Sequence, residues 1–138
     1  MRSNYDYAWD VEECYVSDSV GHEKCEALGG SLAKILSEDE STIIKNFLNQ
    51  ATLNLKTYSA GVWIGGRPID ETIDADWEWV SDGSKITGFD DWGDDKPDSA
   101  GMYRGGSCLA LSPDEDWSWH DQDCYTDGVI LCEGTGQL

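Results

Sequence analysis

Apolar residues in the first fifty positions recur at spacings typical of short strands and amphipathic helices. Residues 14–16 form a small apolar run that predicts a strand. Residues 20–28 predict a helix, which ends at Gly29-Gly30 because glycine readily takes the left-handed conformation found at helix C-termini. A further short strand is expected over residues 32–35. The N-terminal region is therefore expected to run as strand, helix, strand.

The next segment predicts a helix with a defined beginning. Ser37 and Glu40 have the S-x-x-E spacing of a capping box, in which two side chains satisfy backbone N–H groups at the start of a helix. Apolar residues then recur at helical spacing, at Ile43, Ile44, Phe47 and Leu48. We expect this helix to run from about residue 38 to residue 50.

Beyond residue 55 the pattern changes to short apolar stretches in which aromatic residues alternate with polar ones. These stretches predict four strands, at residues 62–64, 77–80, 108–111 and 129–131. Between residues 81 and 107 the chain is rich in glycine and aspartate, contains Pro97, and shows little apolar periodicity. This segment predicts a long surface loop, and loops of that length commonly carry functional residues.

Length and charge limit the class of protein. A chain of 138 residues has the size of one domain, so residues 1–138 are expected to form a single folded unit. No apolar stretch approaches the length of a membrane span, and the formal net charge of -19 repels nucleic-acid phosphates and anionic lipids. Neither nucleic acid nor membrane is therefore an expected partner. The excess of acid indicates a solvated surface in preference to mineral binding.

The five cysteines indicate disulfide bonds in preference to a metal site. They are Cys14, Cys25, Cys108, Cys124 and Cys132. No C-x-x-C pair and no histidine at zinc-binding spacing accompanies them. Two bridges would use four cysteines, in a pairing that composition leaves open, and would imply an oxidising compartment. The first residues lack the apolar segment of a signal peptide, so we expect a mature secreted chain with an added Met1.

The chain offers little for covalent or acid–base catalysis. It contains two histidines, no recognised nucleophile motif, and no isolated pair of carboxylates suited to proton transfer. We therefore expect a binding protein and not an enzyme.

Several segments, taken in order along the chain, resemble the C-type lectin-like domain. The matching segments are residues 25–33, Trp63-Ile64-Gly65-Gly66, Trp77-Glu78-Trp79-Val80, Lys96-Pro97-Asp98, Trp119-His120-Asp121 and Cys132-Glu133. The match extends from about residue 12 to residue 133. It implies an α+β fold, with two helices flanking antiparallel sheets and a long loop that holds the ligand.

The resemblance also assigns the disulfide pairing. It pairs Cys25 with Cys132 and Cys108 with Cys124, so that one bridge ties the two ends of the domain and the other braces the ligand loop. Cys14 is then left without a partner inside the chain. Because an odd cysteine in a secreted protein often forms an intermolecular bond, we expect a disulfide-linked homodimer.

The positions that hold calcium in this family are altered in this chain. By resemblance they are Lys96, Asp98, Gly106, His120 and Asp121. Only the two aspartates supply carboxylate oxygens, whereas calcium takes six to eight oxygen ligands. The ammonium of Lys96 would in addition repel a divalent cation. We therefore expect neither a bound metal nor any other cofactor.

A lysine between two carboxylates suggests a site in which the ammonium replaces the lost ion. Lysine donates hydrogen bonds, aspartate accepts them, and histidine can do either. An acetamido group fits this set, because it presents a carbonyl acceptor, an N–H donor and a methyl group that an aromatic side chain can cover. The expected ligand-binding residues are Lys96, Asp98, Tyr103, Trp117, His120 and Asp121.

The seven tryptophans are expected to serve mainly in packing. Four match core or sheet positions of the family, namely Trp63, Trp77, Trp79 and Trp119. Trp92 is expected to anchor the long loop. Trp117 is the best candidate for a partly exposed aromatic residue at the ligand.

The expected function is binding of N-acetylated hexosamines, N-acetylglucosamine (GlcNAc) or N-acetylgalactosamine (GalNAc), without calcium. The sequence is similar here to the bivalve N-acetylhexosamine lectins of the butter-clam type, whose motif is Arg-Pro-Asp or Lys-Pro-Asp. One monosaccharide site is weak, so capture of microbial surfaces in innate immunity would need the dimer. The alternative is a lectin-like domain that has lost calcium and binds a protein, ice or mineral surface.

Overall fold

Helices and strands of the chain follow one another in a mixed order. The computed structural model describes residues 9–14, 18–27, 29–50, 61–70, 75–97, 106–126 and 128–133. The elements are β1 (Trp9–Cys14), α1 (Asp18–Ala27), β2 (Ser31–Leu32), α2 (Glu38–Asn49), β3 (Val62–Trp63), β4 (Gly66–Pro68), β5 (Trp77–Trp79), β6 (Ser107–Ser112), the 3-10 helix η3 (Pro113–Glu115), β7 (Ser118–Asp123) and β8 (Gly128–Glu133). The expected α+β fold, with two helices and antiparallel sheets, is confirmed.

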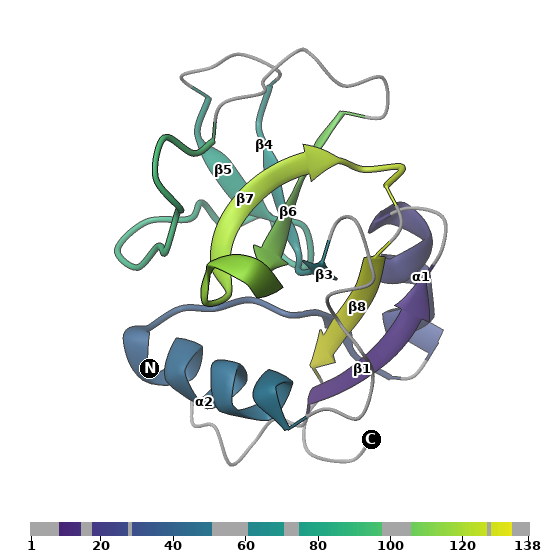
Figure 1. The fold of residues 1–138 in the computed structure, drawn as a ribbon. Helices are drawn as coiled ribbons and strands as arrows, with labels where there is room; N and C mark the ends of the chain where they lie inside the picture. Colours follow the sequence, from purple (N-terminus) through teal and green to yellow (C-terminus); the bar gives the residue numbers. More distant parts are fainter. Residues whose placement is uncertain are drawn as a thin grey trace.

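Most strands belong to one sheet in the order β1-β8-β3-β6-β7, and β2 also pairs with β8. All its pairings are antiparallel except that of β3 with β8. Strands β4 and β5 form a separate antiparallel pair. Figure 1 shows α2 below this framework, α1 beside β8 and β1, and β7 curving across the front. β7 is therefore the edge strand nearest to the long loop.

The central strands bury side chains on both faces, because successive residues of a strand point to opposite sides. In β6, Leu109 and Leu111 face a core that also contains Ile44 and Leu48 of α2. The alternate residues Cys108 and Ala110 face a second cluster with Trp63, Ile130 and the other bridged cysteines. Helix α2 thus covers one face of the sheet, and the second face holds both disulfides.

Helix α1 ends where two glycines follow it, as predicted. The backbone N–H of Gly30 donates to the carbonyl oxygen of Cys25 at 2.9 Å. The N–H of Gly29 donates to the backbone carbonyl oxygen of Glu26 at 3.0 Å. Gly29 has a φ of 88°, a left-handed value that residues with a side chain rarely adopt. These are the bonds of a Schellman motif, which satisfies carbonyl groups at the end of a helix.

Helix α2 begins with the predicted cap. The N–H of Glu40 donates to Ser37 Oγ at 3.2 Å. In return Glu40 Oε1 accepts from the N–H of Leu36 at 2.8 Å, one residue before the position expected for a capping box. Glu40 is only 2% exposed, so its carboxylate is a buried part of the helix start.

The structure differs from the predicted strands at several ends. β1 ends at Cys14, so the predicted strand at 14–16 begins too late, and residues 15–16 lie outside the described part. β2 has two residues instead of four, although Ala33 still donates to the carbonyl oxygen of Leu131 at 2.9 Å. β4 and β7 had no predicted counterpart, since neither shows clear apolar alternation.

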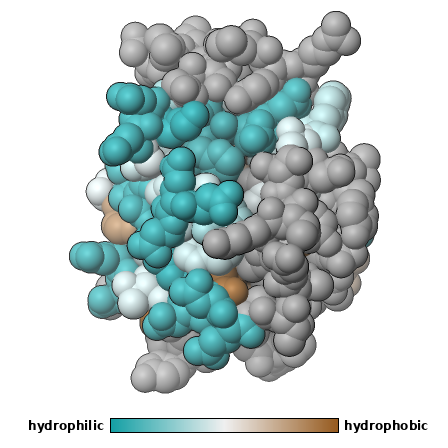
Figure 2. All heavy atoms as spheres, viewed as in Figure 1, coloured by the Kyte–Doolittle hydropathy of each residue, from teal (hydrophilic) through white to brown (hydrophobic). Residues whose placement is uncertain are grey.

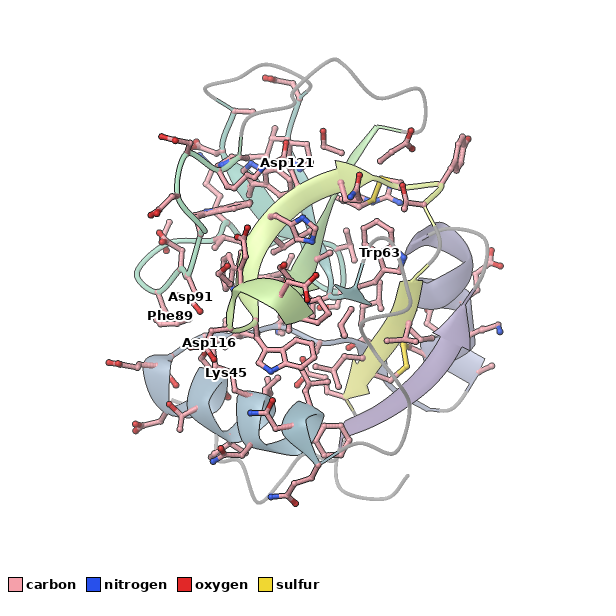
Figure 3. All side chains as sticks on the ribbon, in the orientation of Figure 1. Lys45, Trp63, Phe89, Asp91, Asp116 and Asp121 are labelled. Atoms are coloured by element: carbon pink, nitrogen blue, oxygen red, sulfur yellow. A yellow bond between two sulfur atoms is a disulfide. The ribbon has the colours of Figure 1, made fainter. Side chains whose placement is uncertain are left out.

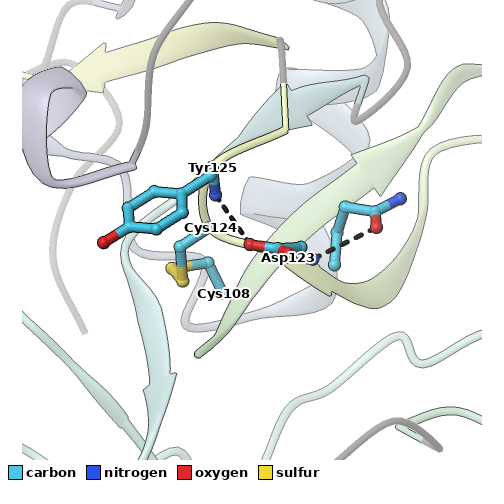
Figure 4. Close-up of a disulfide and its surroundings, with 5 residues drawn as sticks. Cys108, Asp123, Cys124 and Tyr125 are labelled. Atoms are coloured by element: carbon cyan, nitrogen blue, oxygen red, sulfur yellow. Dashed lines mark hydrogen bonds between the residues drawn. A yellow bond between two sulfur atoms is a disulfide. The ribbon is translucent and has the colours of Figure 1, made fainter. Parts of the chain in front are cut away.

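Both disulfides join the cysteines that the resemblance assigned. Cys25 and Cys132 are 107 residues apart and tie α1 to the last strand. Cys108 and Cys124 are 16 residues apart and join β6 to the turn after β7. In this turn the N–H of Tyr125 donates to Asp123 Oδ1 at 3.0 Å (Figure 4). Both bridges belong to the second core cluster.

Two lysines from the helical side of the fold contact the long loop. Lys34 Nζ lies 2.8 Å from Asp82 Oδ2, and Lys45 Nζ of α2 lies 3.0 Å from Asp91 Oδ2 (Figure 3). The hydrogen bond from Lys34, assisted by Ser84, holds the pKa of the Asp82 carboxyl well below its usual value. Because these groups are partly exposed, each pair contributes at most about 1 kcal/mol, and its main role is to position the loop.

Trp117 lies in the core, and the prediction that it is a partly exposed ligand contact is wrong. Its side chain is 7% exposed. Its indole N–H donates to Asn49 Oδ1 at the end of α2, at 2.9 Å. Asp116 and Trp117 have left-handed φ values of 55° and 61°, so the chain reverses here and directs the ring towards α2. The ring is therefore not available to a ligand on the long loop.

Removing each disulfide tests the roles of the two bridges. Replacing Cys25 and Cys132 by Ala should lower the free energy of unfolding by about 5 kcal/mol, and replacing Cys108 and Cys124 by about 3 kcal/mol, because the longer loop loses more chain entropy when it is closed. Denaturant unfolding of both double variants measures the difference. An equal or reversed order would contradict this account.

Asn49→Ala tests the anchoring of Trp117. Loss of the hydrogen bond should lower the free energy of unfolding by about 1 kcal/mol. Asn46→Ala, an exposed position on the same helix, is the matched control for the change in helix propensity. The difference in unfolding midpoint between the two variants isolates the bond. If both variants unfold alike, Trp117 is held by packing alone.

Candidate functional site

The long loop is attached to the sheet at β7. The backbone N–H of Trp119 donates to the carbonyl oxygen of Asp91 at 2.8 Å. The N–H of Gly93 donates to the carbonyl oxygen of Trp119 at 2.9 Å. Trp92 and Trp119 thereby form a parallel bridge. Residues 91–93 extend the sheet by one short segment, so the residues that follow start from a fixed backbone position.

Contacts between aromatic side chains also hold residues 91–93 in place. The ring centroid of Trp92 lies 4.9 Å from that of Trp77 and 5.6 Å from that of Trp119, both edge to face. Trp119 also contacts Trp79 at 5.8 Å and Phe89 at 6.0 Å. Edge-to-face pairs of this kind add about 0.5–1.5 kcal/mol each beyond their burial. Trp92 anchors the loop, as predicted.

A tight turn follows and presents Lys96. The N–H of Lys96 donates to the carbonyl oxygen of Gly93 at 3.1 Å. Asp95 has a left-handed φ of 63°, as the third residue of such turns often does. The Lys96-Pro97 peptide bond is cis, and both residues are half-buried. The turn therefore holds the backbone of Lys96 close to Gly93.

Lys96 lies on the wall of a hollow between the loop and the start of β7. The hollow has a volume of about 400 Å³ and is lined by Trp92, Gly93, Asp94, Lys96, Glu115 and Ser118. A Cβ atom on Gly93 would lie 3.2 Å from both Glu115 Oε2 and Ser118 Oγ. The missing side chain of Gly93 thus leaves these two oxygens accessible beside the loop backbone.

The lining can both donate and accept hydrogen bonds. Lys96 donates, the carboxylates of Asp94 and Glu115 accept, and the hydroxyl of Ser118 can do either. Trp92 adds an aromatic surface. Two negative charges beside one positive charge disfavour an anionic ligand. This combination suits a neutral ligand with several hydroxyl or amide groups.

His120 and Asp121 lie further along β7 and are exposed to different degrees. Asp121 is only 2% exposed, on the same side of the strand as the buried Trp119. His120 is half-buried and, by alternation along the strand, lies on the opposite side. Figure 3 shows Asp121 on the upper part of the fold, at the end of β7 away from α2.

The predicted site residues are thus only partly brought together. The structure places Lys96 beside the start of β7, the strand that carries His120 and Asp121. Asp98 and Tyr103 lie outside the described residues. The side chain of Cys14 lies outside them as well. The roles of Lys96, Asp98, Tyr103, His120 and Asp121 therefore stay predictions, and Trp117 is removed from the set.

Four residues that line the hollow were not predicted from the sequence. Glu115 belongs to η3, Ser118 begins β7, and Gly93 and Asp94 follow the anchoring tryptophan. Each is a common surface residue type in an acidic chain, and no motif marks it. The one available signal was the Trp92-Gly93 pair inside a run of aspartates, which indicates a close approach of backbone.

The donor set does not fit calcium at the positions that the family resemblance indicates. Lys96 places an ammonium there, and Gly106 has no side chain. Hard divalent cations require several oxygen ligands around one point. The described residues contain no group of three or more His, Cys, Asp or Glu side chains arranged to hold a metal ion.

The hydrophilic character of the molecule is visible on the face in Figure 2, where the described residues are mostly polar. Among the residues that the structure describes, the large hydrophobic side chains that are exposed are Leu36, Ile43, Ile69 and Tyr125. In the part of the chain that the structure describes, no helix has both the length and the apolarity needed to cross a membrane.

Solved structures share the fold. The first is the SPL-1–GlcNAc complex, with 24% sequence identity, a TM-score of 0.72, and coverage of 94% of this chain and 88% of that chain. Human lithostathine has 20% identity, a TM-score of 0.77, and coverage of 97% and 95%. A calcium-independent type II antifreeze protein has 21% identity, a TM-score of 0.71, and coverage of 97% and 90%. At these identities the likeness establishes the fold alone.

Family membership comes from the sequence profile. No curated protein matched the sequence in a direct comparison. The profile of the lectin C-type domain, however, matches residues 9–134, which is nearly the whole chain. Both disulfides, the two helices and the loop packed on β7 agree with that assignment. The chain therefore belongs to the C-type lectin domain family.

Proposed function

We propose that this protein is a lectin that binds N-acetylated hexosamines, GlcNAc or GalNAc, through their acetamido group and without calcium. Proteins of this family are generally binding proteins and not enzymes. A neighbour in fold, SPL-1, has been solved in complex with GlcNAc. The Lys-Pro-Asp motif supports a relation to the bivalve N-acetylhexosamine lectins of the butter-clam type.

The observation that carries the proposal is the placement of Lys96. Its backbone is held by the turn from Gly93, and its side chain lines a hollow of ligand size. A lysine ammonium has three N–H donors, so it can donate to a ligand carbonyl while keeping contacts within the protein. Less entropy is lost on binding when the backbone that carries the donor is already held in place.

An acetamido group matches the proposed residues atom by atom. Lys96 donates to its carbonyl oxygen, and Asp98 accepts from its N–H. Tyr103 covers the methyl group, and His120 forms a further polar contact from β7. The carboxylate of Asp121 is buried, so we assign it to balancing the charge of the site in preference to direct contact. A hexose without the acetamido group would satisfy fewer of these groups.

The positive charge of Lys96 should repel a calcium ion at this site. At 4 Å and an effective dielectric constant of about 20, two unit charges interact by about 4 kcal/mol. Repulsion of a divalent ion would be about twice as large. The ammonium of Lys96 is itself stabilised by the neighbouring carboxylates. The cation is thus supplied by the chain itself.

The competing proposal is a domain that binds a protein, ice or mineral surface. One solved structure with this fold is described as a calcium-independent antifreeze protein. The net charge of -19 would favour a mineral surface with positive ions. Such a protein would adhere to calcium carbonate, and free sugar would not release it.

The direct test is calorimetric titration with GlcNAc, GalNAc and glucose, with and without a chelator. We expect both N-acetylated sugars to bind, glucose to bind more weakly, and the chelator to change nothing. Lys96→Ala should weaken binding about tenfold to a hundredfold, because a hydrogen bond to a charged group is lost.

Lys85→Ala is the matched control, because Lys85 is exposed on the same loop and pairs with Asp76 at 3.2 Å, away from the hollow. It should bind GlcNAc like the unchanged protein. Loss of binding on chelation would contradict the calcium-free mechanism. Full affinity in Lys96→Ala would remove this residue from the site.

We further propose that two secreted chains are joined through Cys14. A single monosaccharide site gives affinities near millimolar, and two linked sites raise the avidity for a microbial surface. Mass measurement without reductant should show a dimer that becomes a monomer on reduction. Cys14→Ser should be monomeric and should no longer agglutinate sugar-coated particles, with its affinity for free GlcNAc unchanged. A dimer that persists in Cys14→Ser would contradict this assignment.

A further inference from the structure

The hollow beside Lys96 contains more polar groups than one acetamido group can use. Besides Lys96 it offers Asp94, Glu115, Ser118 and the ring of Trp92. The proposed acetamido contacts, in contrast, come from residues 96–103 and from β7 beyond Trp119. Lys96 is the member common to both groups. A ligand held at Lys96 can therefore extend into the hollow.

The hollow has the size and composition of a carbohydrate subsite. Its volume of about 400 Å³ falls in the range of about 300–1,000 Å³ that is common for small-molecule sites. Carboxylates accept hydrogen bonds from sugar hydroxyls, and an indole packs against the apolar face of a sugar ring. An apolar ligand would leave Asp94 and Glu115 desolvated without partners, and an anion would be repelled by them.

The hollow is also formed in advance. Trp92 is held between Trp77 and Trp119 and by the backbone pairing with β7. Lys45 of α2 pairs with the adjoining Asp91. Gly93 leaves Glu115 Oε2 and Ser118 Oγ uncovered, since even one Cβ atom there would lie 3.2 Å from each. Little ordering is needed when a second ring enters, which favours binding.

We propose that the hollow lined by Trp92, Glu115 and Ser118 is a second subsite, which binds the sugar residue next to the N-acetylhexosamine held at Lys96. The preferred ligand is therefore an N-acetylhexosamine within a disaccharide or longer glycan, not a free monosaccharide. In this arrangement Trp92 packs on the second ring, and Glu115 and Ser118 accept from its hydroxyl groups. This inference depends on the proposed function, because Lys96 joins the two subsites.

Calorimetry on the full chain with GlcNAc and with its β1,4-linked disaccharide, N,N′-diacetylchitobiose, tests the second subsite. We expect the disaccharide to bind about tenfold more tightly, from one packed ring and its hydrogen bonds. Glu115→Gln and Ser118→Ala should each reduce this advantage to about threefold or less. Because neither residue is among the proposed acetamido contacts, each change should lower the affinity for the disaccharide more than the affinity for GlcNAc alone.

Two further variants keep the test independent of folding. Gly93→Ala places a methyl group 3.2 Å from Glu115 Oε2 and Ser118 Oγ and should reduce the advantage of the disaccharide in the same way. The backbone should tolerate it, because the φ of Gly93 is not in the left-handed region. Asp114→Asn changes the acid next to Glu115 that does not line the hollow, and should keep the full advantage. Thermal unfolding of each variant confirms that it is folded.

The outcomes separate this inference from the proposed function. Equal affinities for GlcNAc and the disaccharide, or an advantage that survives Glu115→Gln, Ser118→Ala and Gly93→Ala, would overturn the subsite alone. Binding of neither sugar would overturn the proposed function and the subsite together. An advantage lost equally in Asp114→Asn would show a general effect of charge and would also contradict the subsite.

Discussion

The attachment of the long loop to β7 is the interaction on which the candidate site depends. Two backbone hydrogen bonds join residues 91–93 to Trp119, and the ring of Trp92 packs against that of Trp119. The turn that presents Lys96 begins at Gly93. The backbone position of Lys96 is thus set by the edge of the sheet and not by the loop alone.

The sheet can serve as a rigid support because both of its faces are buried. On one face the aliphatic residues of β6 and β8 pack with α2 and the tryptophan cluster. On the other face the two disulfides lie among Trp63, Ala110 and Ile130. Cross-links on one side and aromatic packing on the other restrict movement of β7. A weakly binding site benefits from such rigidity, because few side chains have to be ordered when a sugar binds.

Helices and central strands were predictable because local chemistry specifies them. Ser37 and Glu40 mark the start of α2, and Gly29 marks the end of α1. The strand β7 was not predictable, because its buried side carries Trp119 and the acid Asp121 in place of an apolar series. A hydrophobic pattern cannot reveal a strand whose inner face is partly charged.

The site was predictable only where a motif identified it. Lys96 came from the family resemblance, whereas Glu115 and Ser118 come close to Gly93 only through the tertiary fold. Trp117 was expected to be partly exposed, but it lies in the core. Two successive left-handed residues instead turn its ring towards Asn49. Backbone reversals of this kind depend on the surrounding packing, and the residue types at positions 116 and 117 do not predict them.

The central claim is that the ammonium of Lys96 provides the anchoring charge that calcium provides elsewhere in this family. A crystal structure with a bound N-acetylhexosamine, grown in the presence of calcium chloride, tests it most directly. The account predicts the acetamido carbonyl oxygen within hydrogen-bonding distance of Lys96 Nζ and no metal between Lys96 and β7. A calcium ion coordinated at that position, or a sugar bound on another surface, would contradict it.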